Sequence, residues 1–221
     1  MKTKDRIIKS SIELFNKHGV SNVTTNHIAE YMGISPGNLY YHFRNKEEIV
    51  YEVFGTVDSI LRKSWSVFSD QQMSLTEIAD YIQVMFTALW DYYFFFRDLP
   101  QLLKKDEKLK EAYRQLHFRY VEELDAFYVR LSEIGFMKPM NDPSERRALV
   151  INTWMIAGSW AGYLEGLGEP ISPGNLRQGL EQISHLIRSY TQDHIRDSVT
   201  MIMTQFAAKL EKAALEKESE N

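Results

Sequence analysis

The chain has 221 residues, a net charge of −4, 44% hydrophobic and 25% charged residues, and no cysteine. This is the composition of a globular protein with ample chain to bury a core. It excludes wholesale disorder, disulfides, thiolate metal sites and a cysteine nucleophile. The longest nearly apolar stretch, residues 153–164, falls short of the roughly 20 residues that cross a bilayer. No signal peptide is expected, and we predict a cytoplasmic protein without a membrane span.

Charge is divided unevenly along the chain. Residues 1–46 hold seven basic and three acidic residues, a net charge of +4, whereas the rest of the chain carries −8. A basic N-terminal segment on an acidic body favours a polyanion as the partner of that segment alone. Surface charge distributed unevenly by chance would give the same pattern.

Apolar residues recur at spacings of three and four along nearly the whole chain, as the buried face of a helix requires. The first stripe spans residues 7–15 and ends at Gly19, a long one spans residues 109–134, and the last spans residues 199–210. Capping residues precede several helices, namely Ser35, Asn45, Ser74, Asp142 and Ser172. Because no segment alternates like a β-strand, we predict an all-α protein of about nine or ten helices.

Residues 24–43 have the pattern of two short helices joined by a sharp turn. Thr24 or Thr25 caps the first helix, Gly33 permits a left-handed backbone at the turn, and Ser35-Pro36 opens the second helix. This is the helix-turn-helix arrangement, in which the second helix enters the major groove of DNA. A helical hairpin with surface aromatic residues would show a similar pattern.

The second of these helices carries side chains suited to DNA. Its start is small or polar, so the backbone can approach base edges, and Asn38 can donate and accept at a base pair. Tyr40, Tyr41 and His42 have polar tips that suit phosphate oxygens. Lys46 opens the next helix, where its ammonium and the free N–H groups can hold a phosphate.

The ordered motifs of residues 8–54 resemble the N-terminal domain of the TetR/AcrR family of bacterial transcriptional regulators. The matching segments are Phe15-Asn16-Lys17-His18-Gly19, Val23-Thr24-Thr25, Ile28-Ala29, Gly33-Ile34-Ser35, Leu39-Tyr40-Tyr41-His42-Phe43 and Lys46-Glu47-Glu48-Ile49. The resemblance implies a three-helix DNA-binding domain at residues 1–46 and a helical effector-binding and dimerisation domain at residues 47–221.

We predict that the residues at the DNA are those of the two short helices and the start of the next one: Thr24, Thr25, Asn26, Ser35, Pro36, Gly37, Asn38, Tyr40, Tyr41, His42 and Lys46. Pro36-Gly37 stands where the family often has Lys or Thr and offers no side-chain donor. Direct base reading therefore moves to Asn38, Asn26 and Tyr41.

The resemblance also implies a homodimer formed by the last two long helices, here within residues 144–167 and 176–214. Gly158 and Gly162 lie four residues apart and form a smooth strip against which another backbone can pack. We predict a dimer interface that includes Gly158, Gly162, Ile202 and Phe206. Packing within one chain would use the same strip, and the residues alone leave both possibilities open.

Six of the seven residues from Trp90 to Phe96 are aromatic, so a helix here must be buried on every side or line a cavity. Ligand pockets are mostly apolar. We predict a pocket for a lipophilic small molecule, lined by Met85, Trp90, Tyr93, Tyr120, Phe127 and Trp154. Each of these residues is equally suited to an ordinary core.

Motifs of enzymes and metal sites are missing from the sequence. It has no Walker motif, no dinucleotide loop after a strand and no HExxH spacing among its six histidines. We therefore expect no enzyme activity, no cofactor and no metal ion. The function predicted is a ligand-responsive repressor that leaves its DNA operator when a lipophilic effector binds. The alternative is a helical lipid- or hydrophobe-binding protein that does not recognise DNA.

Overall fold

The computed structural model describes residues 2–66, 73–198, 201 and 208, and within these residues it contains helices and no strand, which confirms the all-α prediction. The elements are α1 (Thr3–His18), the short 3₁₀ helix η1 (Val20–Asn22), α2 (Thr25–Tyr31), α3 (Pro36–His42), α4 (Lys46–Ser66), α5 (Leu75–Asp91), α6 (Tyr93–Lys105), α7 (Glu107–Glu133), α8 (Pro143–Leu167) and α9 (Pro173–Ile187). Residues 193–198 are also helical.

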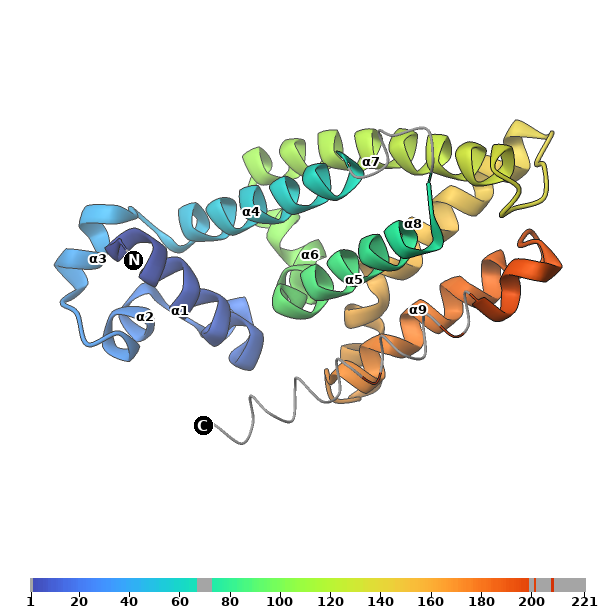
Figure 1. Ribbon diagram of the computed structural model, residues 1–221. Helices are drawn as coiled ribbons and strands as arrows, with labels where there is room; N and C mark the ends of the chain where they lie inside the picture. The colour runs from blue at the N-terminus through green and yellow to red at the C-terminus, as the bar shows by residue number, and fades with distance from the viewer. Residues whose placement is uncertain (1, 67–72, 199–200, 202–207, 209–221) are drawn as a thin grey trace.

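The helices form a small head and a larger body (Figure 1). The head consists of α1, α2 and α3 packed around the fully buried Phe15, Ile28 and Leu39. The body consists of α5 to α9, and α4 runs from the head along the body (Figure 1). One hydrophobic core continues from the head through α4 into the body, since Val53 and Val57 of α4 belong to the same buried cluster. The boundary between residues 46 and 47 stays a prediction, but it lies where α4 begins.

The predicted capping residues occupy the helix starts. The hydroxyls of Ser35, Ser74 and Ser172 accept hydrogen bonds from backbone N–H groups of α3, α5 and α9, and Asp142 caps α8 in the same way. Asn45 Oδ1 accepts from the Glu48 N–H at 2.9 Å. These caps satisfy N–H groups that no helical carbonyl can reach, so the helix boundaries were readable from local chemistry.

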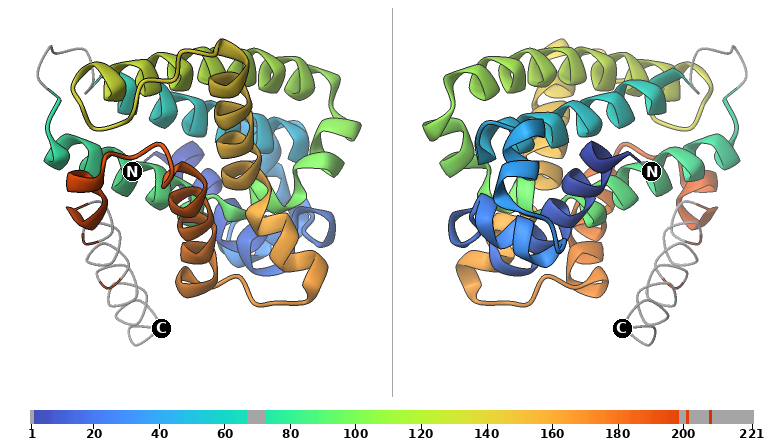
Figure 2. Two further views of the ribbon diagram at one scale, coloured as in Figure 1. Left: turned by 90° about the vertical axis from the view of Figure 1, so that its right-hand side faces the viewer. Right: turned by 90° about the vertical axis from the view of Figure 1, so that its left-hand side faces the viewer.

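The body is built on the long α7, which α8 crosses steeply (Figure 2, left panel). Helix α9 packs against α8, and the contact is closest where Gly179 of α9 meets Trp160 of α8. A methyl group at Gly179 of α9 would lie 2.7 Å from Trp160 Cγ of α8. The Trp160 indole N–H donates to the Asn175 carbonyl at 2.8 Å and fixes the ring over Gly179. Glycine is required at position 179 because it has no side chain, and not because of its backbone angles.

The aromatic segment of residues 90–96 is not one continuous helix. It is divided at Tyr92, whose backbone leaves the helical region between α5 and α6. Phe94 and Phe95 turn into the core shared with the head, where the rings of Phe94 and Phe15 lie 5.2 Å apart. The prediction of burial is therefore confirmed for these two residues, and their place is the junction between head and body.

This junction is held by hydrogen bonds between α6 and the C-terminal end of α1. The Arg97 guanidinium donates to the Phe15 carbonyl at 2.9 Å and to the Asn16 carbonyl at 3.1 Å. Tyr93 Oη donates to the same Asn16 carbonyl at 2.8 Å. Arg97 also pairs with Asp98, and Asp98 accepts from the Val20 N–H at 2.9 Å. The Phe15 carbonyl also accepts from the Gly19 N–H at 2.9 Å. The Asn16 carbonyl is satisfied by the body, since the Val20 N–H donates to Asp98 instead.

The Asn16 side chain completes the junction. Its amide nitrogen donates to the Asp91 carbonyl at 2.9 Å, and its oxygen accepts from the Phe94 N–H at 3.0 Å. Asn16 therefore satisfies two backbone groups at the point where α5 gives way to α6. The position of the head relative to the body is set by directional bonds as well as by apolar packing.

Replacing Gly179 with alanine tests the α8–α9 contact. The added methyl group collides with the Trp160 ring, so Gly179→Ala should lower the free energy of unfolding by about 1–3 kcal/mol, as overpacking does. The matched control is Gly55→Ala on α4, where none of the described atoms lies within 4 Å of the new methyl group. That control should gain about 0.5–1 kcal/mol from helix propensity. Urea unfolding followed by circular dichroism measures both, and equal values for the two variants would contradict the contact.

Replacing Asn16 with alanine tests the junction. The Phe94 N–H and the Asp91 carbonyl lose their partner, and a buried polar group without one costs about 1–3 kcal/mol of folding free energy. Asn26→Ala on the exposed side of α2 is the control and should stay within about 0.5 kcal/mol of the parent. Chemical unfolding at one protein concentration compares them. A stability of Asn16→Ala equal to that of the control would rule out a stabilising role for these bonds.

Candidate DNA-binding surface and effector cavity

The turn between α2 and α3 has the geometry that the sequence predicts. Gly33 adopts φ +66°, the left-handed region that glycine enters without strain. The Ile34 N–H donates to the Ala29 carbonyl at 3.0 Å, which closes the turn over α2. Thr24, and not Thr25, caps α2, since its hydroxyl accepts from the His27 N–H at 3.2 Å. Thr25 instead joins the two helices, because its hydroxyl lies 3.0 Å from Tyr40 Oη.

One face of α3 is buried and the other is open to solvent. Leu39 is fully buried beneath the helix, while Tyr41 is 86% exposed. The helix lies at the outer end of the head, away from the body (Figure 1). The structure brings most of the predicted DNA-binding residues onto this accessible end of the head; those classed as exposed are Thr24, Asn26, Ser35, Pro36, Gly37, Asn38, Tyr40 and Tyr41, with Thr25 and His42 partly buried.

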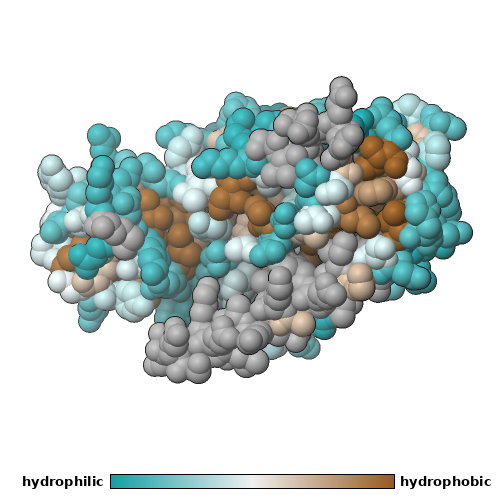
Figure 3. Space-filling model, viewed as in Figure 1, coloured by the Kyte–Doolittle hydropathy of each residue, from teal (hydrophilic) through white to brown (hydrophobic). Residues whose placement is uncertain are grey.

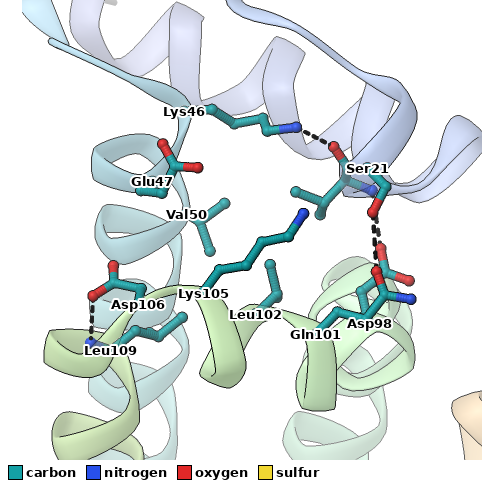
Figure 4. A pocket seen from close by; sticks show the side chains of 11 residues that line it. Ser21, Lys46, Glu47, Val50, Asp98, Gln101, Leu102, Lys105, Asp106 and Leu109 are labelled. Carbon is teal, nitrogen blue, oxygen red and sulfur yellow. Dashed lines mark hydrogen bonds between the residues drawn. The ribbon is translucent and has the colours of Figure 1, made fainter.

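Lys46 has a role that the sequence did not predict. Its ammonium donates to the carbonyls of Val20 and Val23, the second at 2.7 Å, and so ties the start of α4 to η1 (Figure 4). Partial burial lowers the pKa of Lys46. Lys105 of α6 extends toward the same place from the body, beside a small polar cavity of about 70 Å³ (Figure 4). Two of the three N–H groups of Lys46 are used by the carbonyls of Val20 and Val23, and the third remains for a phosphate. Contact with a phosphate stays a prediction.

A larger, apolar cavity lies in the body. Its volume is about 150 Å³, and its walls come from α5, α7, α8 and α9 and from residues that follow α7 and α9. It extends along α5 from Ile78 to Leu89. Apolar side chains also reach the surface of the body in the view of Figure 3. A smaller chamber of about 30 Å³ adjoins it and shares Met85, Leu89, Tyr120 and Ala157 with it. The smaller chamber extends to Phe95 and Phe96 of α6.

Four of the six residues predicted as an effector wall lie at this double cavity. Met85, Tyr120 and Phe127 line the main chamber, and Trp154 lines the smaller one beside Met85 and Tyr120. Trp90 and Tyr93 line neither chamber. Both pack beside α8 and α9 in a second apolar cluster, and Tyr93 also binds α1, because the helix break at Tyr92 turns them away from the cavity.

The sequence analysis missed the polar pairs of the cavity wall. Tyr81 Oη lies 2.7 Å from Tyr120 Oη, and Tyr128 Oη lies 2.8 Å from Thr153 Oγ1. Burial raises the pKa of all three phenols, that of Tyr128 to about 12, so they stay protonated and neutral. Tyr81 and Tyr128 sit on ordinary helical stripes. Nothing in their spacing separates them from core tyrosines.

The glycines predicted for a dimer interface, Gly158 and Gly162, are partly buried in the single chain. A methyl group at Gly162 would lie 3.6 Å from the Arg97 carbonyl of α6, and Gly158 borders the smaller chamber. A methyl group at Gly158 would meet no described atom within 4 Å, so a dimer interface at this strip stays a prediction beside packing within the chain. The exposed stripe of α8 is the neighbouring one, with Met155, Ser159, Tyr163 and Leu167 at four-residue intervals. The other two predicted residues, Ile202 and Phe206, lie outside the described residues.

The described parts of the chain contain neither a candidate metal site nor a candidate membrane span. No group of three or more His, Cys, Asp or Glu side chains there could hold a metal ion. Among the same residues, no helix is long and apolar enough to cross a membrane.

Known proteins match both parts of the chain. Residues 7–53 match the family described as "Bacterial regulatory proteins, tetR family", and residues 59–199 match the TetR family described as "Bacterial transcriptional repressor". The regulator QacR of Staphylococcus aureus is 27% identical over 145 residues, which are 60% of this chain and 71% of QacR. The biofilm operon regulator IcaR of Staphylococcus epidermidis is 26% identical over 72% of this chain and 85% of its own.

Solved structures agree with the sequence matches. A TetR-family transcriptional regulator from Marinobacter aquaeolei VT8 superposes with a TM-score of 0.83 and 34% identity, over 93% of this chain and 99% of its own. These relatives are regulators of transcription and not enzymes. The helix-turn-helix head, the helical body and these matches together show that the chain belongs to the TetR family of bacterial transcriptional regulators and is a DNA-binding regulator.

Proposed function

We propose that this protein is a homodimeric repressor that leaves its operator when an apolar small molecule enters the body cavity. The observation that supports it most directly is the link between the two sites. The smaller chamber ends at Phe95 and Phe96 of α6, and the next residue, Arg97, holds the carbonyls that end α1. A ligand that displaces the chamber wall therefore acts on the helix that positions the head.

DNA binding in this proposal uses the exposed end of the head. The start of α3 enters the major groove, where Asn38 reads a base pair and the small Gly37 lets the backbone approach. Tyr41, Tyr40 and Thr25 lie at the phosphates on either side, and the hydroxyl contact between Tyr40 and Thr25 holds the two helices in register. The +4 charge of residues 1–46 favours this end for DNA, while the −8 charge of the remainder disfavours the body.

A dimer is needed because two heads must meet two half-sites spaced by whole turns of DNA. The exposed apolar stripe of α8 supports a two-fold interface there, since Met155, Tyr163 and Leu167 each remain more than half exposed in the single chain. An effector would then weaken DNA binding by favouring a different separation of the heads. It must bind that arrangement more tightly than the DNA-bound one, because equal affinity shifts no population.

Other regulators of this fold support the effector part of the proposal in general terms. One solved structure is the complex of SmeT with triclosan, which superposes with a TM-score of 0.57 at 17% identity. The alternative function is a hydrophobe-binding protein whose head does not recognise DNA. Binding to duplex that is absent, or that does not weaken as salt rises, would favour this alternative.

The proposal is tested first by recovering the operator. Random duplex is selected on the full-length protein, and the recovered sites report sequence preference and half-site spacing together. Compounds that raise the melting temperature of the protein are then added to the complex with the recovered operator. We expect some of them to lower the affinity for the operator. If every compound that binds the protein leaves operator affinity unchanged, effector-controlled release is wrong.

Replacing Asn38 with alanine removes the proposed base contact. The affinity for the recovered operator should fall by roughly 1–3 kcal/mol, while that for random duplex stays the same. The control is Asn141→Ala, an exposed site in the loop before α8. Fluorescence anisotropy with labelled duplex measures both affinities. Equal losses on operator and random duplex, or no loss on either, would remove Asn38 from base reading.

Replacing Lys46 with alanine separates its two roles. If Lys46 contacts a phosphate, the slope of log affinity against log salt should become shallower by about one per head, equally for all sequences. Loss of the bonds to Val20 and Val23 should in addition lower the melting temperature. Binding is therefore measured well below that temperature, where circular dichroism confirms folded protein. A lower melting temperature with an unchanged slope would assign Lys46 a structural role alone.

A further inference from the structure

The hydroxyl groups of the body cavity differ in what they can offer a ligand. Thr153 Oγ1 donates its only proton to the Leu149 carbonyl at 2.9 Å. It must therefore accept from Tyr128, whose oxygen lies 2.8 Å away. The proton of Tyr128 is used in this bond, so Tyr128 can present only lone pairs to a ligand.

The Tyr81–Tyr120 pair is different. Its two hydroxyls carry two protons, and the 2.7 Å bond between them uses one. Tyr120 can direct the other proton at Met85 Sδ, 3.9 Å from its oxygen. A thioether is a weak acceptor, so an oxygen atom brought into the cavity beside Met85 would make a stronger hydrogen bond with Tyr120.

The walls of the cavity select against a charged ligand. None of the described residues that line the main chamber or its smaller neighbour is acidic or basic. An ion buried without a partner loses its hydration, and the few hydroxyl groups present do not replace it. High phenol pKa values keep the tyrosines from supplying a countercharge to a cation.

The shape of the cavity limits the size of the ligand. Its main chamber of about 150 Å³ is comparable to an engineered apolar cavity that holds benzene. The adjoining chamber gives an elongated ligand room to extend past Met85 and Leu89. A ligand of about six to ten non-hydrogen atoms, as a ring or a short chain, suits these dimensions.

We propose that the cavity binds an uncharged, mostly hydrocarbon molecule with one carbonyl or hydroxyl oxygen, which accepts a hydrogen bond from Tyr120. A hydroxyl on the ligand could in addition donate to an oxygen lone pair of the cavity wall. This inference rests on the proposed function and names the class of its effector. In this proposal, the hydroxyl of Tyr120 donates to the polar group of the ligand. The uncharged walls disfavour ions, because they offer no partner for a charge.

The test uses three probes with the same chain and different ends: 1-octanol, octanoate and octylammonium. Isothermal titration calorimetry with the full-length protein at pH 7 measures their affinities. We expect 1-octanol to bind at least tenfold more tightly than either ion. Octanoate or octylammonium binding as tightly as 1-octanol would overturn the proposal, and so would the absence of binding by all three probes.

A variant of Tyr120 tests the hydrogen bond. Tyr120→Phe keeps the ring and removes the donor, so it should weaken 1-octanol about 3- to 10-fold and leave 1-chlorooctane, which offers no oxygen, unchanged. Tyr31→Phe on the exposed side of α2 is the control and should change neither affinity. Equal weakening of both probes by Tyr120→Phe would mean that the hydroxyl acts on packing only. If this variant does not fold, the three probes on the parent protein decide the uncharged class. The carbonyl stretch of bound 2-octanone, which an accepted hydrogen bond lowers, then decides the bond, and an unshifted stretch would overturn it.

The same probes separate this inference from the proposed function. If 1-octanol binds as expected but leaves operator affinity unchanged, the ligand class holds and effector-controlled release fails. If a charged probe binds more tightly and releases the operator, release holds and the uncharged class is wrong.

Discussion

The C-terminal end of α1 is bound to the body by side-chain donors of α6. Arg97 and Tyr93 donate to the carbonyls of Phe15 and Asn16, and Asn16 in turn satisfies two backbone groups where α5 gives way to α6. Hydrogen bonds depend on angle, so they restrict the orientation of the head relative to the body more than apolar contacts do. The head is therefore held at one angle to the body, and a change in α6 must change either these bonds or that angle.

The same helix borders the apolar cavity proposed to bind an effector and packs against α8, the helix proposed to form the dimer interface. Phe95 and Phe96 border the smaller chamber, while the Arg97 carbonyl lies against Gly162 of α8. One short helix thus contacts the head, the cavity and α8 at successive residues. In the proposed function, a ligand that shifts α6 would therefore act directly on the contacts that position the head.

Charge and polarity are distributed in keeping with these roles. The head is basic, the remainder acidic, and the described walls of the cavity are uncharged. Lys46 lies at the border, where its ammonium donates to the carbonyls of Val20 and Val23. If Lys46 also contacts a phosphate, as proposed, the same side chain affects both folding and DNA binding.

The sequence by itself determined the helices, their caps and the helix-turn-helix, because these depend on residues at most four apart. Gly33, Ser35 and Ser74 act on their own backbone neighbourhood, and the spacing of motifs in residues 8–54 was specific enough to indicate the family. The tertiary structure decided which apolar stripe faces which partner. Trp90 and Tyr93 line neither chamber of the cavity, whereas Tyr81 and Tyr128 line the main one, because this depends on how α5, α6 and α8 cross. A helical period of 3.6 residues identifies a buried face, but a core, a cavity and an interface all satisfy it equally.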